Sequence, residues 1–259
     1  MNALEKVKVA EGWIKKLEPR YVDLLGRDSA RFVRLAMQAV RTTPKLAECS
    51  LPSVLGAVME CAQLRLEPSV NGDCWILPYK GVAKLIIGYR GMAKLAYRSS
   101  LVASVNAAVV YEGDEFRYSL GTEAGIHHIP SGQTDPNRIT HAYAVIRTTL
   151  GGVVFRVLTR SEIDAARKRS ASGTQPGGPW AQHYAEMAMK TAVRRVSKLG
   201  PCDADMARAI DLDEAGESGR PQSLEMSLPE DFIDAESSEP EPNLGARPHA
   251  QSAREGGGA

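Results

Sequence analysis

The stretch CWILPYKGVAKLIIGYRGMAKLAYR, residues 74–98, decides the fold. Its first part holds two short runs of apolar or alternating residues, 74–81 and 82–89, which meet around Lys80-Gly81. This pattern predicts a β-hairpin, because two such runs joined by a glycine-containing pair are typical of two strands and a turn. Residues 90–98 then predict a short helix. A hairpin followed at once by a helix indicates a fold that mixes helices and strands.

The flanking sequence extends this mixture in both directions. Residues 1–67 have helical patterns, in which Ser50 can cap a helix with Pro52 in its first turn and Glu67-Pro68 ends it. Downstream we expect a strand over 101–111 paired with 115–120, a loop over 121–138, a second hairpin over 139–158, and helices over 161–168 and 180–199. The predicted fold class is therefore α+β, with mixed helices and antiparallel hairpins or a sheet.

The formal net charge of +1 hides a strong asymmetry along the chain. Residues 203–259 contain 14 acidic and four basic residues, whereas residues 1–202 contain 17 acidic and 28 basic ones. A basic body with an acidic tail favours nucleic-acid binding, and chance clustering of surface charge is the alternative.

Composition also divides the chain. We predict an N-terminal helical segment over 1–45 that makes oligomer contacts, a DNA-binding core over 46–213 and a disordered acidic tail over 214–259. The tail is rich in Gly, Ser, Pro and Glu, so it buries too little apolar surface to offset its ordering entropy. Its apolar island, 224–233, is either a short partner-binding motif or an interruption in a linker.

Several classes of protein are disfavoured. No run of about 18 apolar residues is present, and the N-terminus lacks the apolar region of a secretory signal, so we expect a cytoplasmic protein without a membrane span. The chain has no Gly-Lys dipeptide, which disfavours a Walker-type ATPase, and it lacks GxSxG, HExxH and CxxC motifs. No catalytic residue is predicted.

Two groups of side chains allow a metal site as an alternative. His127, His128 and His141 lie in or beside a loop, and structural or surface roles are favoured for them over metal ligation. The acidic group Glu112, Asp114 and Glu115 has the residue type that binds a divalent ion in nucleases, although surface carboxylates in a turn at the end of a strand are the preferred interpretation. We therefore predict no metal ligand.

Rows of cations mark the predicted nucleic-acid site. In the 180–199 helix Lys190, Arg194 and Lys198 are four residues apart, and Arg195 widens the row. The 90–98 helix repeats the arrangement with Arg90, Lys94 and Arg98, with Tyr97 beside them. Cations near an aromatic ring suit single-stranded DNA, whereas a solvated helix face is the alternative. Trp180 either stacks on bases or anchors the core.

The second hairpin adds a pair of arginines. If Gly151-Gly152 form a two-residue turn, Arg147 lies directly opposite Arg156. Like charges in this position are destabilising unless an anion such as a phosphate lies between them, or unless both splay into water.

Four blocks of sequence resemble the RecT family of phage single-strand annealing proteins. They are TPKLAECSLPSVLGAVMECAQLRLEP (43–68), LPYKGVAKLIIGYRGMAKLAYRSS (77–100), VVYEGDEFRYSLG (109–121) and PWAQHYAEMAMKTAVRRVSKLGP (179–201). They occur in the order of the family and cover about 40–213. The chain departs from the family in the turn after the 90–98 helix, where the family often has Gly and this chain has Ser100.

The resemblance implies an ATP-independent recombinase of phage or prophage origin in a bacterial host. Such proteins bind single-stranded and annealed DNA, assemble with themselves into rings or helical filaments, and act beside a phage exonuclease and a host single-strand-binding protein. The implied fold is related to the Rad52-type annealing fold, with a basic DNA-binding groove. No cofactor is expected apart from a non-specific dependence of annealing on Mg²⁺. The alternatives are a metal-dependent nuclease and a passive single-strand-binding protein.

The basic and aromatic positions from the residue patterns and from the resemblance together form the predicted DNA-binding set. It consists of Tyr89, Arg90, Lys94, Tyr97, Arg98, Arg147, Arg156, Trp180, Lys190, Arg194, Arg195 and Lys198. Loss of Lys190 and Arg194 together is expected to weaken binding and to flatten its salt dependence. The acidic tail is expected to compete with DNA for the groove or to contact host replication proteins.

Overall fold

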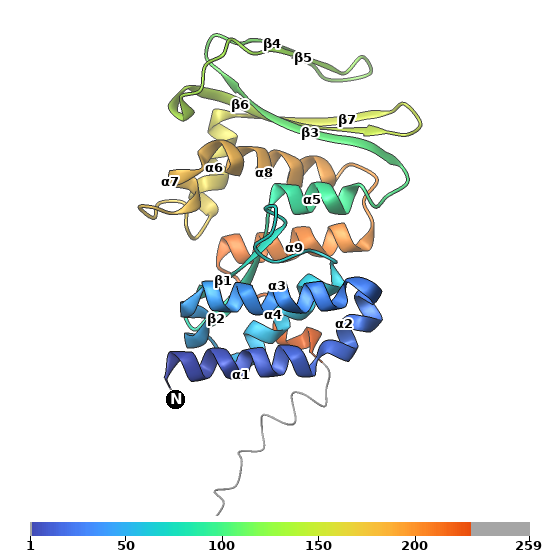
Figure 1. Cartoon of the computed structure of the whole chain (residues 1–259). Coiled ribbons are helices and arrows are strands. Elements are labelled where there is room, and N and C mark those ends of the chain that lie inside the picture. The colour runs from blue at the N-terminus through green and yellow to red at the C-terminus, as the bar shows by residue number, and fades with distance from the viewer. Residues whose placement is uncertain (1, 229–259) are drawn as a thin grey trace, which may run out of the picture. The chain divides into compact units, whose positions relative to one another are not determined.

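The computed structural model describes residues 2–228, which combine helices with antiparallel sheets and so confirm the predicted α+β class (Figure 1). The helices are α1 (Ala3–Lys16), α2 (Glu18–Leu25), α3 (Ser29–Thr42), α4 (Leu51–Gln63), α5 (Tyr89–Ala96), α6 (Arg160–Arg169), α7 (Pro179–Gln182), α8 (Tyr184–Ser197) and α9 (Ala204–Ser218). The strands are β1 (Cys74–Tyr79), β2 (Val82–Ile87), β3 (Val102–Tyr111), β4 (Glu115–Ser119), β5 (Gly125–Ile129), β6 (Ile139–Thr148) and β7 (Val153–Thr159). Short 3₁₀ helices are η1 (Gly26–Asp28), η2 (Pro44–Glu48), η3 (Pro136–Arg138) and η4 (Leu224–Ser227).

A three-stranded antiparallel sheet in the order β3-β6-β7 lies directly over α5 and α8 (Figure 1). Along β6, Ala142, Ala144 and Ile146 are buried at every second position, which is the period of a strand with one face on the core. From α8, Ala188, Ala192 and Val196 are also fully buried. The small side chains allow the helix to pack closely under the sheet.

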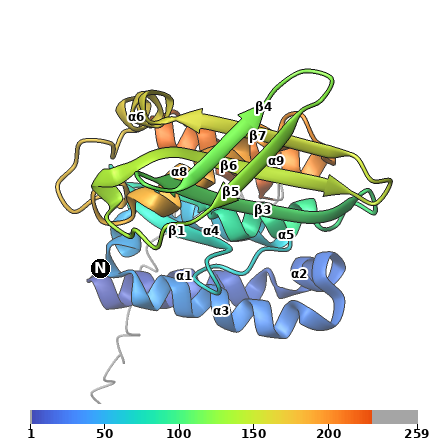
Figure 2. The ribbon, with the colours of Figure 1, turned by 90° about the horizontal axis from the view of Figure 1, so that it is seen from above.

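The β4–β5 hairpin crosses over the other face of this sheet (Figure 2). Phe116 of β4 stacks on Tyr143 of β6, with ring centroids 5.8 Å apart. The expectation that 115–120 pairs with the 101–111 strand is wrong, because β3 pairs with β6 and β4 pairs with β5. The predicted loop over 121–138 therefore contains a strand, which its Gly-rich flanks and exposed residues conceal.

The β6–β7 register also differs from the expected one. The strands are joined through a four-residue connection, in which the Thr148 amide donates to the Gly152 carbonyl at 2.8 Å. Arg147 consequently pairs with Val153, and Arg156 pairs with Ala144. The predicted opposition of Arg147 and Arg156 is wrong, because a shift by an odd number of residues sends the two side chains to opposite faces of the sheet.

The β1–β2 hairpin has the predicted position and packs one face on α4. Cys74, Ile76, Leu85 and Ile87 form this buried face. Helix α4 is buried from Ser53 to Ala62, which explains why its sequence is apolar on all sides.

Residues 214–228 belong to the folded unit, so the predicted start of the disordered tail at residue 214 is wrong. Asp203 caps the N-terminus of helix α9, where its carboxylate accepts from the Met206 amide at 2.9 Å, and the helix continues to Ser218. Leu224 and Leu228 are buried, and η4 packs against α4. The apolar island therefore starts as part of the core. The rest of the predicted tail, 229–259, lies outside the described residues.

The contact between η4 and α4 depends on a glycine. A Cβ atom built on Gly56 would lie 2.2 Å from the backbone oxygen of Leu224, which real structures do not tolerate. Gly12 of α1 has no atom within 4 Å of the same position, so it provides a matched control.

We predict that Gly56→Ala lowers the free energy of unfolding by roughly 1–3 kcal/mol, because the η4 backbone must move away from α4. Gly12→Ala is expected to raise it by roughly 0.5–1 kcal/mol, since glycine weakens a helix interior. Urea unfolding of both variants measures the difference. Equal stabilities would contradict the docking of residues 224–228 on α4.

Candidate nucleic-acid interface

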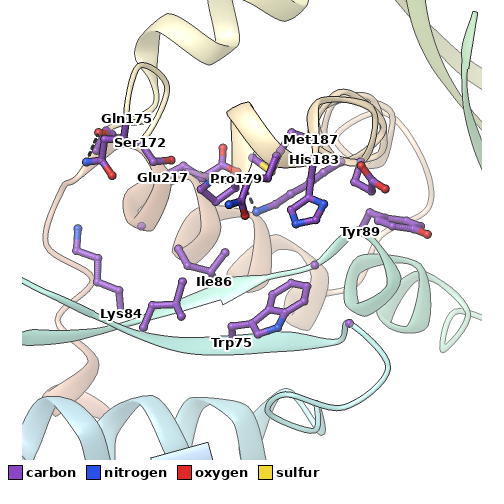
Figure 3. Close-up of a pocket in the computed structure, with 18 of the residues that line it drawn as sticks. Trp75, Lys84, Ile86, Tyr89, Ser172, Gln175, Pro179, His183, Met187 and Glu217 are labelled. Atoms are coloured by element: carbon purple, nitrogen blue, oxygen red, sulfur yellow. Dashed lines mark hydrogen bonds and ion pairs between the residues drawn. The ribbon is translucent and has the colours of Figure 1, made fainter. Parts of the chain in front are cut away.

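An open cleft of about 750 Å³ lies between the β1–β2 hairpin and the segment that leads into α7 and α8 (Figure 3). We call it the aromatic cleft, because Trp75, Tyr79 and Tyr89 line it together with Leu77 and Ile86. None of its aromatic residues except Tyr89 is in the predicted DNA-binding set. Sequence reasoning overlooked them although the signal was present.

That signal is the alternation of buried and exposed side chains along β1. Because Cys74 and Ile76 face α4, Trp75 and Leu77 must face the other way. The register places Trp75 beside Ile86 and Leu77 beside Lys84, so both strands contribute to one apolar face. Trp75 is 39% exposed and Leu77 is 40% exposed. An exposed apolar face of this kind is typical of a binding surface.

Two cations border this apolar face. Lys84 Nζ lies 4.5 Å from the ring centroid of Tyr79 and donates to the Arg220 carbonyl at 3.1 Å. Burial, and then the charge of Lys80, lower the pKa of Lys84. Arg90 is exposed, and its Nε donates to the Tyr89 hydroxyl at 3.4 Å.

A glycine at the start of α5 brings Tyr89 and Arg90 to the cleft. A Cβ atom on Gly88 would lie 2.0 Å from the Gly72 carbonyl oxygen and 2.9 Å from the Trp75 ring. Only glycine therefore allows the loop before β1 to approach the N-terminus of α5. This approach places the ring of Trp75 close to α5.

The wall opposite the hairpin is largely polar. It contains Ser172, Gln175, Gln182, His183 and Glu186, and Figure 3 shows His183 and Met187 on the opposite side of the cleft from Trp75. A flat apolar surface on one side and hydrogen-bonding groups on the other suit a heterocyclic base, which has an apolar face and a polar edge.

A second hollow of about 510 Å³ lies among β7, α6, α8 and the end of α9, and we call it the basic cavity. Its charged lining consists of Arg156, Arg169, Arg194, Arg195, Lys198, Glu214, Glu217 and Arg220. Four of these cations belong to the predicted set, whereas Arg169 and Arg220 were not predicted. No periodic signal joins those two to the rest, because they come from different elements.

Lys190 and Arg194 of the predicted α8 row form a buried ion-pair cluster with two carboxylates of α9. Lys190 Nζ lies 2.7 Å from Asp213 and 2.9 Å from Glu217, while Arg194 lies 3.0 Å from Asp213 and 2.7 Å from Glu217. Asp213 also accepts from the Ile87 amide at 3.1 Å. The expected exposed row is therefore wrong at these two positions, and only Arg195 and Lys198 continue it toward the surface.

The cluster is electrostatically balanced, with two cations and two carboxylates. Burial alone lowers the pKa of Lys190, but Asp213 and Glu217 outweigh this effect and raise it. Burial raises the pKa of Asp213, and this effect exceeds the lowering of the pKa by the two cations. For Glu217 the effect of the two cations exceeds that of burial and lowers the pKa to about 2.

The row on α5 is also mostly engaged within the protein. Lys94 pairs with Asp73 at 2.7 Å, and Arg98 donates to backbone carbonyls at the end of α4 and to Asp205. The Tyr97 hydroxyl accepts from the Val105 amide at 3.0 Å. Of the three cations in this row, Arg90 alone lines the aromatic cleft.

Trp180 and Arg147 have other positions. Trp180 is 1% exposed and packs edge-on against Tyr184, with centroids 5.8 Å apart. It anchors the core, so the alternative in which it stacks on bases is wrong. Arg147 is exposed on the sheet face opposite α8, away from both hollows.

The acidic and histidine groups do not combine into a metal site. Within residues 2–228 no three His, Cys, Asp or Glu side chains are arranged to hold a metal ion. Asp114 instead accepts hydrogen bonds from the Ser131 and Tyr111 amides and from His128, which bonds Tyr143 through its other nitrogen. Burial raises the pKa of Asp114, but these hydrogen bonds outweigh it and hold the pKa well below its usual range.

No helix within residues 2–228 is both long enough and apolar enough to cross a membrane. An α+β fold with an exposed aromatic hairpin face, cations at its border and a separate basic cavity has the features of a nucleic-acid-binding protein. The particular family follows from similarity to known proteins.

The model of the RecT family matches residues 30–225. The chain is 42% identical over 193 residues to Protein RecT of Escherichia coli (strain K12), which covers 71% of each chain. It is 26% identical over 194 residues to Uncharacterized protein YqaK of Bacillus subtilis (strain 168), which covers 74% of this chain and 66% of that protein. The chain belongs to the RecT family, and this membership supports a role in DNA recombination and annealing.

We predict that acid destabilises the protein through Glu217. Its pKa is about 2 in the fold against an ordinary 4.5, so the stability it contributes is present above about pH 4.5 and is lost as the pH falls toward 2. Glu217→Gln is expected to cost about 3 kcal/mol at pH 7 and to reduce the loss between pH 5 and pH 2. Urea unfolding across this pH range measures both effects.

The exposed Glu123 serves as the control, since Glu123→Gln should leave the pH dependence as it is. A Glu217→Gln protein with the stability and pH dependence of the original would contradict the ion-pair cluster.

Proposed function

We propose that the protein binds single-stranded DNA and anneals it to a complementary strand without ATP. The observation that carries this proposal is the apolar face of the β1–β2 hairpin, exposed in a chain of the RecT family and bordered by Lys84 and Arg90. Bases stack on aromatic side chains without regard to sequence, which an annealing protein requires.

Annealing needs no bond to be made or broken in the DNA. It needs cations that neutralise two polyanions, and it needs bases that are free to pair. Phosphate contacts from Lys and Arg supply the first requirement without sequence preference. The absence of a Gly-Lys dipeptide, and with it of a Walker motif, agrees with a reaction that does not use ATP.

The remaining parts of the proposal concern the surroundings of the protein. We propose that it assembles into rings or helical filaments in the cytoplasm of a bacterial host, and that it acts beside an exonuclease and a host single-strand-binding protein. Mg²⁺ would assist annealing by screening phosphates and would not bind a dedicated site.

We predict that Trp75→Ala weakens single-stranded DNA binding by roughly 5- to 100-fold, which is the range for the loss of one stacked base. Trp75→Phe should retain most of the affinity. Fluorescence anisotropy with a labelled oligonucleotide measures the change. Tyr118, an aromatic residue on β4 that is 42% exposed and lies outside the cleft, provides the matched control Tyr118→Ala.

The reaction itself is tested with two labelled complementary oligonucleotides, Mg²⁺ and no nucleotide triphosphate. Pairing faster than in buffer is expected. Coating that blocks pairing would show a passive binding protein, and cleavage of the strands would show a nuclease. Affinity that is equal in the Trp75→Ala and Tyr118→Ala proteins would contradict the assignment of the aromatic cleft.

A further inference from the structure

We infer that the basic cavity is a second nucleic-acid site, which holds the phosphodiester backbone of the complementary strand while the first strand lies on the β1–β2 hairpin. This inference rests on the proposed annealing function. It assigns a ligand to residues that the first-strand site does not use.

The two hollows differ in the chemistry of their linings. Six cations and two carboxylates line the basic cavity, whereas three cations and two carboxylates line the aromatic cleft. Among the described residues, no aromatic side chain lines the basic cavity. This lining suits phosphates and does not suit bases.

Three arginines of the cavity form no ion pair within residues 2–228, and one of them, Arg220, donates to the Ser218 hydroxyl at 3.0 Å. Arg156 of β7 and Arg169 at the end of α6 are both exposed, and neither forms an ion pair within residues 2–228. Arg156 is nevertheless close enough to Glu162 to contribute to its lowered pKa, after the Thr159 hydrogen bonds and Arg195. Such uncompensated cations beside other cations repel one another, and a bound polyanion relieves this repulsion.

Two further cations are held only by partly exposed ion pairs. Arg195 lies 3.3 Å from Glu162, and Lys198 lies 2.6 Å from Glu214. Ion pairs of this kind contribute only about 0–1 kcal/mol, so a phosphate can replace either carboxylate at little cost. The buried pairs of Arg194 with Asp213 and Glu217 are different, and they fix the floor of the cavity.

The position of the cavity fits a second strand. Glu217 lines both hollows, and its backbone oxygen accepts from the Ala171 amide at 2.7 Å. The two sites therefore share one wall, which contains the ion-pair cluster. A strand held through its phosphates leaves the edges of its bases without protein contacts, and such bases can pair with a second strand.

The test uses a probe that has phosphates and no bases, namely a labelled oligomer of abasic deoxyribose phosphates. In the full-length chain, Arg156→Ala with Arg169→Ala should weaken binding of this probe at least tenfold at low salt. The slope of log affinity against log salt should fall by about 1.4, which is the value for two lost phosphate contacts on a single strand. Trp75→Ala should leave binding of the probe unchanged.

The matched control removes two exposed cations that lie outside the cavity, Arg147 on the opposite sheet face and Lys168 on α6. Arg147→Ala with Lys168→Ala should change probe affinity less than threefold. Arg156→Lys with Arg169→Lys keeps the charge and should retain most of the binding. Urea unfolding of all variants excludes loss of the fold, which is not expected because every substituted side chain is exposed.

A second readout is annealing by protein that already carries one labelled strand. The Arg156→Ala, Arg169→Ala protein should keep this strand but capture the complementary strand at least tenfold more slowly. Probe binding equal to that of the Arg147→Ala, Lys168→Ala control would overturn the inference. Loss of the first strand in the same proportion as the second would also overturn it, because the cavity would then belong to the first site.

Failure of the proposed function has a different signature. In that case Trp75→Ala would leave the binding of a base-bearing strand unchanged, whatever the abasic probe showed. The two assignments can therefore fail separately.

Discussion

The fold depends on the ion-pair cluster in which Lys190 and Arg194 of α8 meet Asp213 and Glu217 of α9. Four charged groups can be buried here because they are balanced in number and saturated with hydrogen bonds, which offsets the cost of removing them from water. Asp213 also accepts from the Ile87 amide, so the cluster joins α8, α9 and the β1–β2 hairpin. Removal of one member leaves an uncompensated charge in the interior, and this constraint fixes how the hairpin lies relative to α8.

The cluster also determines which surfaces remain available to a ligand. Lys190 and Arg194 form ion pairs with the carboxylates of α9 within the protein, so they do not form an exposed row of cations. The aromatic cleft lies on one side of the cluster and the basic cavity on the other, and Glu217 lines both. In the proposed arrangement, Trp75 and neighbouring apolar side chains on one side bind bases, and arginines on the other side bind phosphates. The chain would then bind two DNA strands at two separate surfaces.

The sequence was sufficient for the fold class, the β1–β2 and β6–β7 hairpins, and the family. It was not sufficient for α9, because a helix with many carboxylates resembles a disordered acidic segment until its charges are matched with those of α8. The burial of Lys190 and Arg194 did not follow from the sequence for the same reason, since the spacing of cations along a helix is identical whether they face water or another helix. The sheet faces on which Arg147 and Arg156 lie depend on the length of the β6–β7 turn, which is four residues and not the expected two. Trp75 was predictable, because alternation with the buried Ile76 leaves it exposed.

Tryptophan fluorescence tests most directly whether bases stack on the hairpin. Among the three tryptophans, Trp180 is buried and Trp75 faces the aromatic cleft. A base-bearing single strand should quench the emission of the protein, and Trp75→Phe should remove this quenching while the strand remains bound. Quenching that persists unchanged in the Trp75→Phe protein would contradict the placement of the first strand.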